Sequence, residues 1–154
     1  YRNYTDPIDE NLIKKIKNYC KKKGVKFYLS NNIKLAIKHN LDGAYIPAFN
    51  KNILHNAYSM KKDFELIGSA HTLKEIREKE RQNVSSIFLS PLFSSKKNSQ
   101  FLEIYKFLNL KKKTLKKIVC LGGITFNNIK RTTLLNVDAI AAISLFNNKK
   151  FKYL

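Results

Sequence analysis

The sequence predicts an α/β fold in which parallel strands alternate with helices and curl toward a (β/α)₈ TIM barrel. Six short apolar runs alternate with helical patterns along the 154 residues, and such alternation implies parallel strands joined by right-handed crossovers. The same helix-to-strand junction recurs four times. Small or backbone-exposing residues follow the strands, at the end where barrel enzymes build their sites.

The first helix is expected between Asp6, which can cap it, and Gly24, which can end it in the left-handed conformation. Pro7 suits the first helical position. One apolar face is formed by Leu12, Ile13, Ile16, Tyr19 and Cys20. Another helix start is predicted at Thr72, because Thr72 and Glu75 have the spacing of a capping box.

Each of the four junctions places a residue that tolerates positive φ before an apolar residue and a polar one. They are Gly24-Val25-Lys26, Asn40-Leu41-Asp42, Asn83-Val84-Ser85 and Asn136-Val137-Asp138. The first residue ends a helix, and the apolar residue packs back on it. The predicted strands are 25–30, 44–46, 65–67, 87–89, 118–121 and 139–143, and several are continuously apolar, as strands covered on both faces are.

The residues after the strands favour a barrel over a doubly wound sheet. They are Ser30, Pro47, Ser69, Ser90, Gly122-Gly123 and Ser144. No Gly-x-Gly-x-x-Gly motif follows the first strand, which counts against a dinucleotide-binding fold. A complete barrel has eight strands and typically at least about 200 residues. We therefore expect one domain over residues 1–154 that lacks the first strand, the first helix and most of the second strand, with residues 1–4 as the tail of another strand.

Composition indicates a cytoplasmic protein. No stretch approaches the roughly 18 consecutive apolar residues of a membrane helix, and Tyr1 begins no charged-then-apolar leader. Cys20 and Cys120 have neither metal-ligand nor redox spacing, so we expect both to be reduced and buried.

The chain has 30 Lys and Arg against 11 Asp and Glu, a formal charge of +19. Such a charge favours polyanionic partners. Only four of these cations are Arg, the residue that recognises bases and phosphates bidentately. The densest run, 111–117, has no interleaved aromatic residues and lies between a predicted helix and strand. A solvated connector explains it better than a nucleic-acid interface, which stays as a minor alternative.

A phosphate site is predicted where Gly122-Gly123 follows an apolar strand and precedes a helix. Glycine lets backbone N–H groups approach an anion, and a helix start adds partial positive charge. The last strand ends near Ser144, and the loops after the last two strands of such barrels commonly hold a phosphate between them. Two ordinary turns are the alternative.

His71 is the only histidine at a predicted strand end, whereas His39 and His55 fall in helical surroundings. An imidazole at the mouth of the barrel can move protons near neutral pH; the alternative is a histidine that hydrogen-bonds the helix start. The polar, basic loop 90–98 follows the next strand. Its hydroxyl and ammonium groups are able to grip an oxyanion, and a solvated loop is the alternative.

The order and spacing of these pieces resemble the thiamine phosphate synthase family, with its relative the thiazole tautomerase TenI. The resemblance runs from Arg2 to Phe146, and its most specific segments are 69–72, 89–93, 121–125 and 141–144. It implies a (β/α)₈ barrel that acts in thiamine biosynthesis on a phosphorylated thiazole, as a transferase or a tautomerase.

The resemblance also implies roles for individual residues. Gly122, Gly123 and Ser144 would cradle the phosphate of hydroxyethylthiazole phosphate. Arg2 matches an Arg that holds the pyrimidine diphosphate in the synthase, although Tyr4 stands where the family has Lys. The remaining residues assigned to substrate or diphosphate are Ser69, Ser95 and Lys97, the last two in a loop where Asn98 replaces the expected Lys.

The metal site of the synthase is not reproduced. Its aspartates match Asn31 and Asn50, and neutral donors bind Mg²⁺ more weakly than carboxylates do. Mg²⁺ is thus expected as a cofactor only if synthase activity is retained. The tautomerase reaction needs no metal, and the histidine matching His71 is its proposed proton carrier.

Three further expectations remain open. A non-catalytic barrel that binds a phosphorylated ligand is the alternative to an enzyme. No membrane partner is expected. An unclosed sheet edge favours pairing with another copy, so a homo-oligomer is one expected state.

Overall fold

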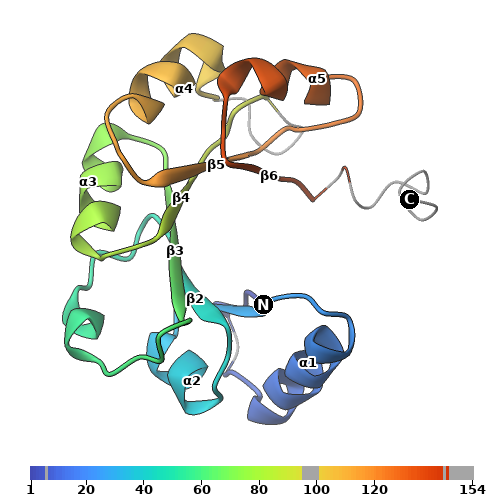
Figure 1. Ribbon diagram of the computed structural model, residues 1–154, viewed down its shortest axis with the longest axis vertical. Coiled ribbons are helices and arrows are strands. Elements are labelled where there is room, and N and C mark those ends of the chain that lie inside the picture. Colours follow the sequence, from blue (N-terminus) through green and yellow to red (C-terminus); the bar gives the residue numbers. More distant parts are fainter. Residues whose placement is uncertain (6, 95–100, 144, 146–154) are drawn as a thin grey trace.

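The computed structural model describes residues 1–5, 7–94, 101–143 and 145. In this part of the chain, six parallel strands form one sheet in sequence order. The strands are β1 (Tyr28–Ser30), β2 (Gly43–Ile46), β3 (Glu65–Ala70), β4 (Ser86–Leu89), β5 (Lys117–Leu121) and β6 (Ala139–Ala141). Figure 1 shows them following an arc, so the sheet is a curled half-barrel, as the sequence predicted.

The helices lie on the convex side and at the two ends of this arc (Figure 1). They are α1 (Glu10–Lys22), α2 (Ile33–Lys38), the 3₁₀ helix η1 (Leu54–Ala57), α3 (Leu73–Arg81), α4 (Glu103–Lys111), α5 (Ile129–Thr132) and the 3₁₀ helix η2 (Thr133–Leu135). The core lies between the convex face of the sheet and these helices. Its fully buried members include Ala44, Ile46, Ile76, Ile87, Leu89, Phe107 and Ile118.

The left-handed residues of the four predicted junctions are confirmed, but Val25 is 53% exposed and does not pack back on its helix as expected. Gly24, Asn40, Asn83 and Asn136 have φ angles of 64°, 49°, 55° and 45°, in the left-handed region that Gly and Asn tolerate. The polar third residue ties neighbouring strands together in three of these junctions. Asp42 accepts a hydrogen bond from Phe27 N at 2.7 Å, Asp138 accepts one from Ile118 N at 2.7 Å, and Ser85 Oγ donates to Leu66 O at 2.9 Å.

The start of the first helix was predicted too early. Asp6 lies outside the described residues, and Pro7 precedes the helix, which begins at Glu10. Asp9 is the cap, because its carboxylate accepts the N–H of Asn11 at 2.8 Å. The predicted apolar face is only partly buried, since Ile13 is fully buried while Tyr19 is 62% exposed.

Tyr1 lies beside β1 as the tail of another strand would. Its N-terminal nitrogen donates to Tyr28 O at 2.7 Å, and its carbonyl accepts Ser30 N at 2.9 Å. These two bonds follow the pattern of a parallel ladder. The edge of β1 is therefore engaged by this residue.

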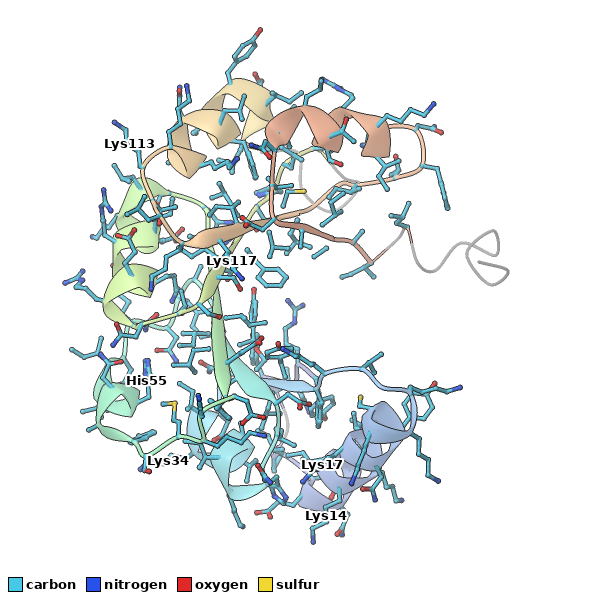
Figure 2. All side chains as sticks on the ribbon, viewed as in Figure 1. Lys14, Lys17, Lys34, His55, Lys113 and Lys117 are labelled. Atoms are coloured by element: carbon cyan, nitrogen blue, oxygen red, sulfur yellow. The ribbon has the colours of Figure 1, made fainter. Side chains whose placement is uncertain are left out.

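The cationic side chains are spread over the molecule. Figure 2 shows Lys14 on α1, Lys34 on α2 and Lys113 beyond α4 at widely separated places. The predicted connector spans the end of α4 and the start of β5, and its Lys111 is engaged, donating to Leu135 O at 3.0 Å. Both cysteines are free thiols; Cys120 is buried as expected, whereas Cys20 is only half-buried. Within the described residues, the helices are too short or too polar to cross a membrane.

Candidate functional site at the mouth of the half-barrel

The register of the sheet brings the strand ends to one rim. Ala70 pairs with Leu89, Leu89 with Cys120, and Leu121 with Ala141. His71, Ser90 and Gly122 each follow one of these paired residues, so they share the carboxyl-terminal edge of the sheet. Barrel enzymes build their sites at this edge.

His71 is held at the rim by both its backbone and its ring. Its N–H donates to Glu75 Oε2 at 2.6 Å, within the predicted capping box that Thr72 and Glu75 form at the start of α3. Its Nδ1 lies 2.6 Å from Ser90 O. Because a carbonyl oxygen only accepts, Nδ1 carries the proton and a neutral ring keeps its lone pair on Nε2. His71 is exposed, so this nitrogen is able to act as a base.

Two of the predicted substrate residues, Arg2 and Ser69, both act on the hydroxyl of Tyr45. The Arg2 guanidinium lies 5.7 Å from the centroid of the Tyr4 ring, and Tyr4 Oη lies 2.7 Å from Ser30 Oγ. Ser69 is buried and hydrogen-bonds Tyr45. Burial raises the pKa of the Tyr45 hydroxyl, and the hydrogen bond with Ser69 and the charge of Arg2 partly oppose that rise.

Asn31 and Asn50, the two residues that the resemblance pairs with metal aspartates of the synthase, meet directly. Asn50 Nδ2 donates to Asn31 Oδ1 at 2.7 Å. One amide must donate to the other, so an N–H group of Asn50 occupies the space between the two side chains. Mg²⁺ would require both side chains to turn oxygen atoms toward that space. The described residues also contain no group of three or more His, Cys, Asp or Glu side chains that could hold a metal ion. The residues present do not fit Mg²⁺.

The Gly122-Gly123 turn needs glycine at both positions. Their φ angles are 98° and 68°, and a Cβ on Gly123 would lie 2.4 Å from Phe93 O. The predicted helix does not start at this turn, because α5 begins only at Ile129. Instead, Asn128 closes the turn: its Nδ2 donates to Gly123 O, and its Oδ1 accepts Thr125 N, both at 2.8 Å.

Three of the predicted site residues, Ser95, Lys97 and Ser144, lie outside the described residues. Two features of the mouth were not predicted from the sequence. Tyr45 was predicted only as an apolar strand residue, although its ring packs edge-to-face on that of Phe88, with the ring centroids 5.8 Å apart. Lys79 was one cation among many, yet its side chain is completely buried. The only sign of this burial in the sequence is that Lys79 occupies an apolar position in the helical pattern.

Burial of Lys79 makes stability depend on pH. Desolvation lowers the pKa of its ammonium from 10.5 to about 8, against the opposing charges of Glu78 and Glu75. Between these two values the unfolded chain holds more protons, so stability rises with pH. The difference in unfolding free energy between the native protein and Lys79→Met should therefore grow in favour of the native protein by about 1 kcal/mol per pH unit between pH 8 and 10. Denaturant titrations measure this difference, and a flat profile would contradict the prediction.

Comparison with known proteins shows the family of the chain. A family model described as thiamine monophosphate synthase matches residues 4–146. The chain belongs to this family. This membership confirms the family resemblance found in the sequence.

The relatives within the family are distant. The chain is 27% identical over 154 residues to the thiamine-phosphate synthase of Helicobacter pylori strain Shi470, covering 97% of this chain and 69% of that protein. It is 26% identical over 133 residues to the thiamine-phosphate synthase of Clostridium acetobutylicum, covering 84% and 63%. The chain therefore spans about two thirds of the length of these curated relatives.

Solved structures share the fold of this member of the thiamine monophosphate synthase family. The thiamine phosphate pyrophosphorylase of Pyrococcus furiosus matches with a TM-score of 0.74 at 14% identity, over 93% of this chain and 70% of that one. The M276A mutant of FabK from Thermotoga maritima matches with a TM-score of 0.71 at 14% identity, over 89% and 49%. These likenesses support a TIM-barrel-like fold, of which the described residues form a six-stranded part.

Proposed function

We propose that this chain acts in thiamine biosynthesis by binding a phosphorylated hydroxyethylthiazole at the mouth of the half-barrel and moving a proton on it without a metal ion. In this proposal the protein is a cytoplasmic, TenI-like tautomerase. Coupling of the thiazole to the pyrimidine diphosphate is the alternative reaction, and binding without turnover is the alternative without catalysis.

The observation that carries the proposal is the hydrogen bond between Asn31 and Asn50, in place of the two carboxylates. Release of diphosphate in the synthase builds up negative charge that a divalent cation neutralises. A neutral amide pair cannot recruit that cation well. An isomerisation has no leaving group, so the loss of the carboxylates does not impair it.

His71 supplies the proton transfer in this proposal. An isomerisation that makes a ring aromatic moves one proton from one atom to another, with no net oxidation or reduction. The hydrogen bond from Nδ1 to Ser90 O fixes the tautomer whose Nε2 accepts a proton. The same nitrogen then returns the proton, and the ring is neutral again.

The phosphate would be held by the Gly122-Gly123 turn. Its glycines have φ angles of 98° and 68°, and a glycine turn lets backbone N–H groups approach an anion closely. Ser144 would complete this cradle, as the family resemblance implies. Arg2 and Ser69, which both act on the Tyr45 hydroxyl, would contact the remainder of the substrate.

Calorimetry and an isomerisation assay test the proposal with the full-length protein. Binding of hydroxyethylthiazole phosphate, together with isomerisation of the thiazole carboxylate phosphate in EDTA, supports it. Diphosphate release from the pyrimidine diphosphate that requires Mg²⁺ would establish the synthase instead. Binding without either reaction would favour the non-catalytic alternative, and absence of binding would overturn the assignment of this site.

Removing metal should leave the native protein unaffected, and restoring both carboxylates should create a metal site. We expect the affinity for the thiazole phosphate to change less than twofold in EDTA. In the double variant Asn31→Asp with Asn50→Asp, two carboxylates replace the amide pair, so Mg²⁺ should bind at least tenfold more tightly than to the native protein. Calorimetric titration with Mg²⁺ measures both. Equal Mg²⁺ affinity of the two proteins would contradict our account of the amide pair.

A further inference from the structure

The connection between β2 and β3 carries Asn50 to the mouth, yet it has little regular structure of its own. Apart from η1, residues 47–64 form no helix or strand. A loop of this kind needs tertiary contacts to hold a side chain in one place. The contacts come from the C-terminal half of α3.

Lys79 is the centre of these contacts. Its side chain is 0% exposed. Its Nζ donates to Pro47 O at 2.8 Å, to Asn50 O at 2.7 Å and to Gln82 Oε1 at 2.7 Å. The three N–H groups of an ammonium thus meet three oxygens, which is full use of the donors of lysine.

Gln82 extends the same set of bonds. Its Nε2 donates to Asn50 O and to Asn52 O, both at 2.9 Å. The backbone carbonyl oxygen of Gln82 lies 2.9 Å from Nε2 of His55, the η1 residue labelled in Figure 2. Asn50 O is therefore shared by Lys79 and Gln82, so the backbone next to the Asn50 side chain is doubly fixed.

β3 is shaped to admit the lysine. A Cβ on Gly68 would lie 2.8 Å from Lys79 Cδ and 3.3 Å from Lys79 Cγ. Glycine at this position leaves the space that the aliphatic stem fills. The stem crosses the core between α3 and the sheet, and the ammonium emerges under the loop.

A buried ammonium is costly unless its hydrogen bonds are complete, and an apolar side chain would fill the same space at lower cost. An apolar side chain, however, has no N–H groups with which to hold the oxygens of Pro47, Asn50 and Gln82 in place. We propose that Lys79 is a positioning residue, which fixes the connection after β2 and thereby holds Asn50 against Asn31 at the mouth of the half-barrel. Its effect on ligand binding rests on the proposed function, whereas its effect on the loop does not.

Hydrogen–deuterium exchange of the full-length protein tests the effect on the loop. In Lys79→Met, which keeps the length of the side chain and removes its donors, amide exchange in residues 47–56 should rise at least tenfold, with less than a twofold rise in β4 and β5. Lys74→Met, at an exposed lysine of the same helix, is the matched control and should change neither. Unchanged exchange in residues 47–56, or an equal rise throughout the sheet, would overturn the proposal.

Binding of hydroxyethylthiazole phosphate tests the effect on Asn50. If Lys79 acts through Asn50, any change in affinity that Lys79→Met causes should match the change that Asn50→Ala causes, and the double variant should bind no more weakly than Asn50→Ala alone. If the double variant instead loses affinity by the product of the two single losses, Lys79 does not act through Asn50. If the native protein does not bind the ligand, the proposed function fails while the exchange result still decides the role of Lys79.

A second variant keeps the test decisive if Lys79→Met does not fold. Gly68→Ala retains the ammonium and displaces the stem, so it should also raise exchange in residues 47–56 selectively. If amide exchange in residues 47–56 of this variant equals that of the native protein, the proposal is overturned.

Discussion

Replacing His71 by asparagine is expected to slow isomerisation of the thiazole carboxylate phosphate by about 10²- to 10⁴-fold, the usual contribution of a general acid–base group. The asparagine side chain keeps an N–H donor near the position of Nδ1, so the contact with Ser90 O is retained. It has no titratable nitrogen in place of Nε2. Steady-state kinetics should therefore show a loss in kcat, while calorimetry shows an affinity for hydroxyethylthiazole phosphate within about threefold of the native value.

His39→Asn is the matched control for this prediction. His39 lies at the end of α2, where its Nε2 is 2.8 Å from Glu10 Oε2. Its replacement should leave kcat unchanged. If His71→Asn retained most of the native kcat, His71 would not be the proton carrier.

Replacing Gly123 by alanine is expected to weaken binding of hydroxyethylthiazole phosphate at least a hundredfold and to lower the free energy of unfolding by roughly 4 kcal/mol. The added Cβ would lie 2.4 Å from Phe93 O and 2.6 Å from Ser94 O. Both are backbone atoms, and this backbone is fixed by the bond from Phe93 N to Gly122 O at 3.1 Å. The turn must therefore shift, which moves the amides that would hold the phosphate. Calorimetry and denaturant unfolding measure the two effects.

Gly24→Ala isolates the contribution of this clash. Gly24 has a φ of +64°, close to the +68° of Gly123, but a Cβ there would meet no atom within 4 Å. Its replacement should cost only the strain of the left-handed conformation, about 1 kcal/mol, and should leave ligand affinity unchanged. Equal destabilisation by both variants would show that the contacts of Gly123 with the segment after β4 have no energetic role.

Local signals were sufficient for the framework of the fold. The left-handed Gly and Asn residues, the capping box at Thr72 and the apolar runs predicted all six strands and their parallel order, because these features depend on nearby residues and on the handedness of crossovers. The same signals placed His71 and Gly122-Gly123 after strands and hence at one rim. The start of α1 was wrong because Asp6 and Asp9 are both plausible caps, and local sequence does not choose between them.

The sequence by itself determined a curled parallel sheet, its family and the identity of the residues that follow each strand. Only the tertiary structure decided that Asn31 and Asn50 share a hydrogen bond, that His71 carries its proton on Nδ1, and that Lys79 is an internal donor to the loop after β2. Each of these facts depends on a contact between segments far apart in the chain. The chemistry of an amide, an imidazole or an ammonium is set by the partner that the fold brings to it, and no periodicity along the chain encodes that partner.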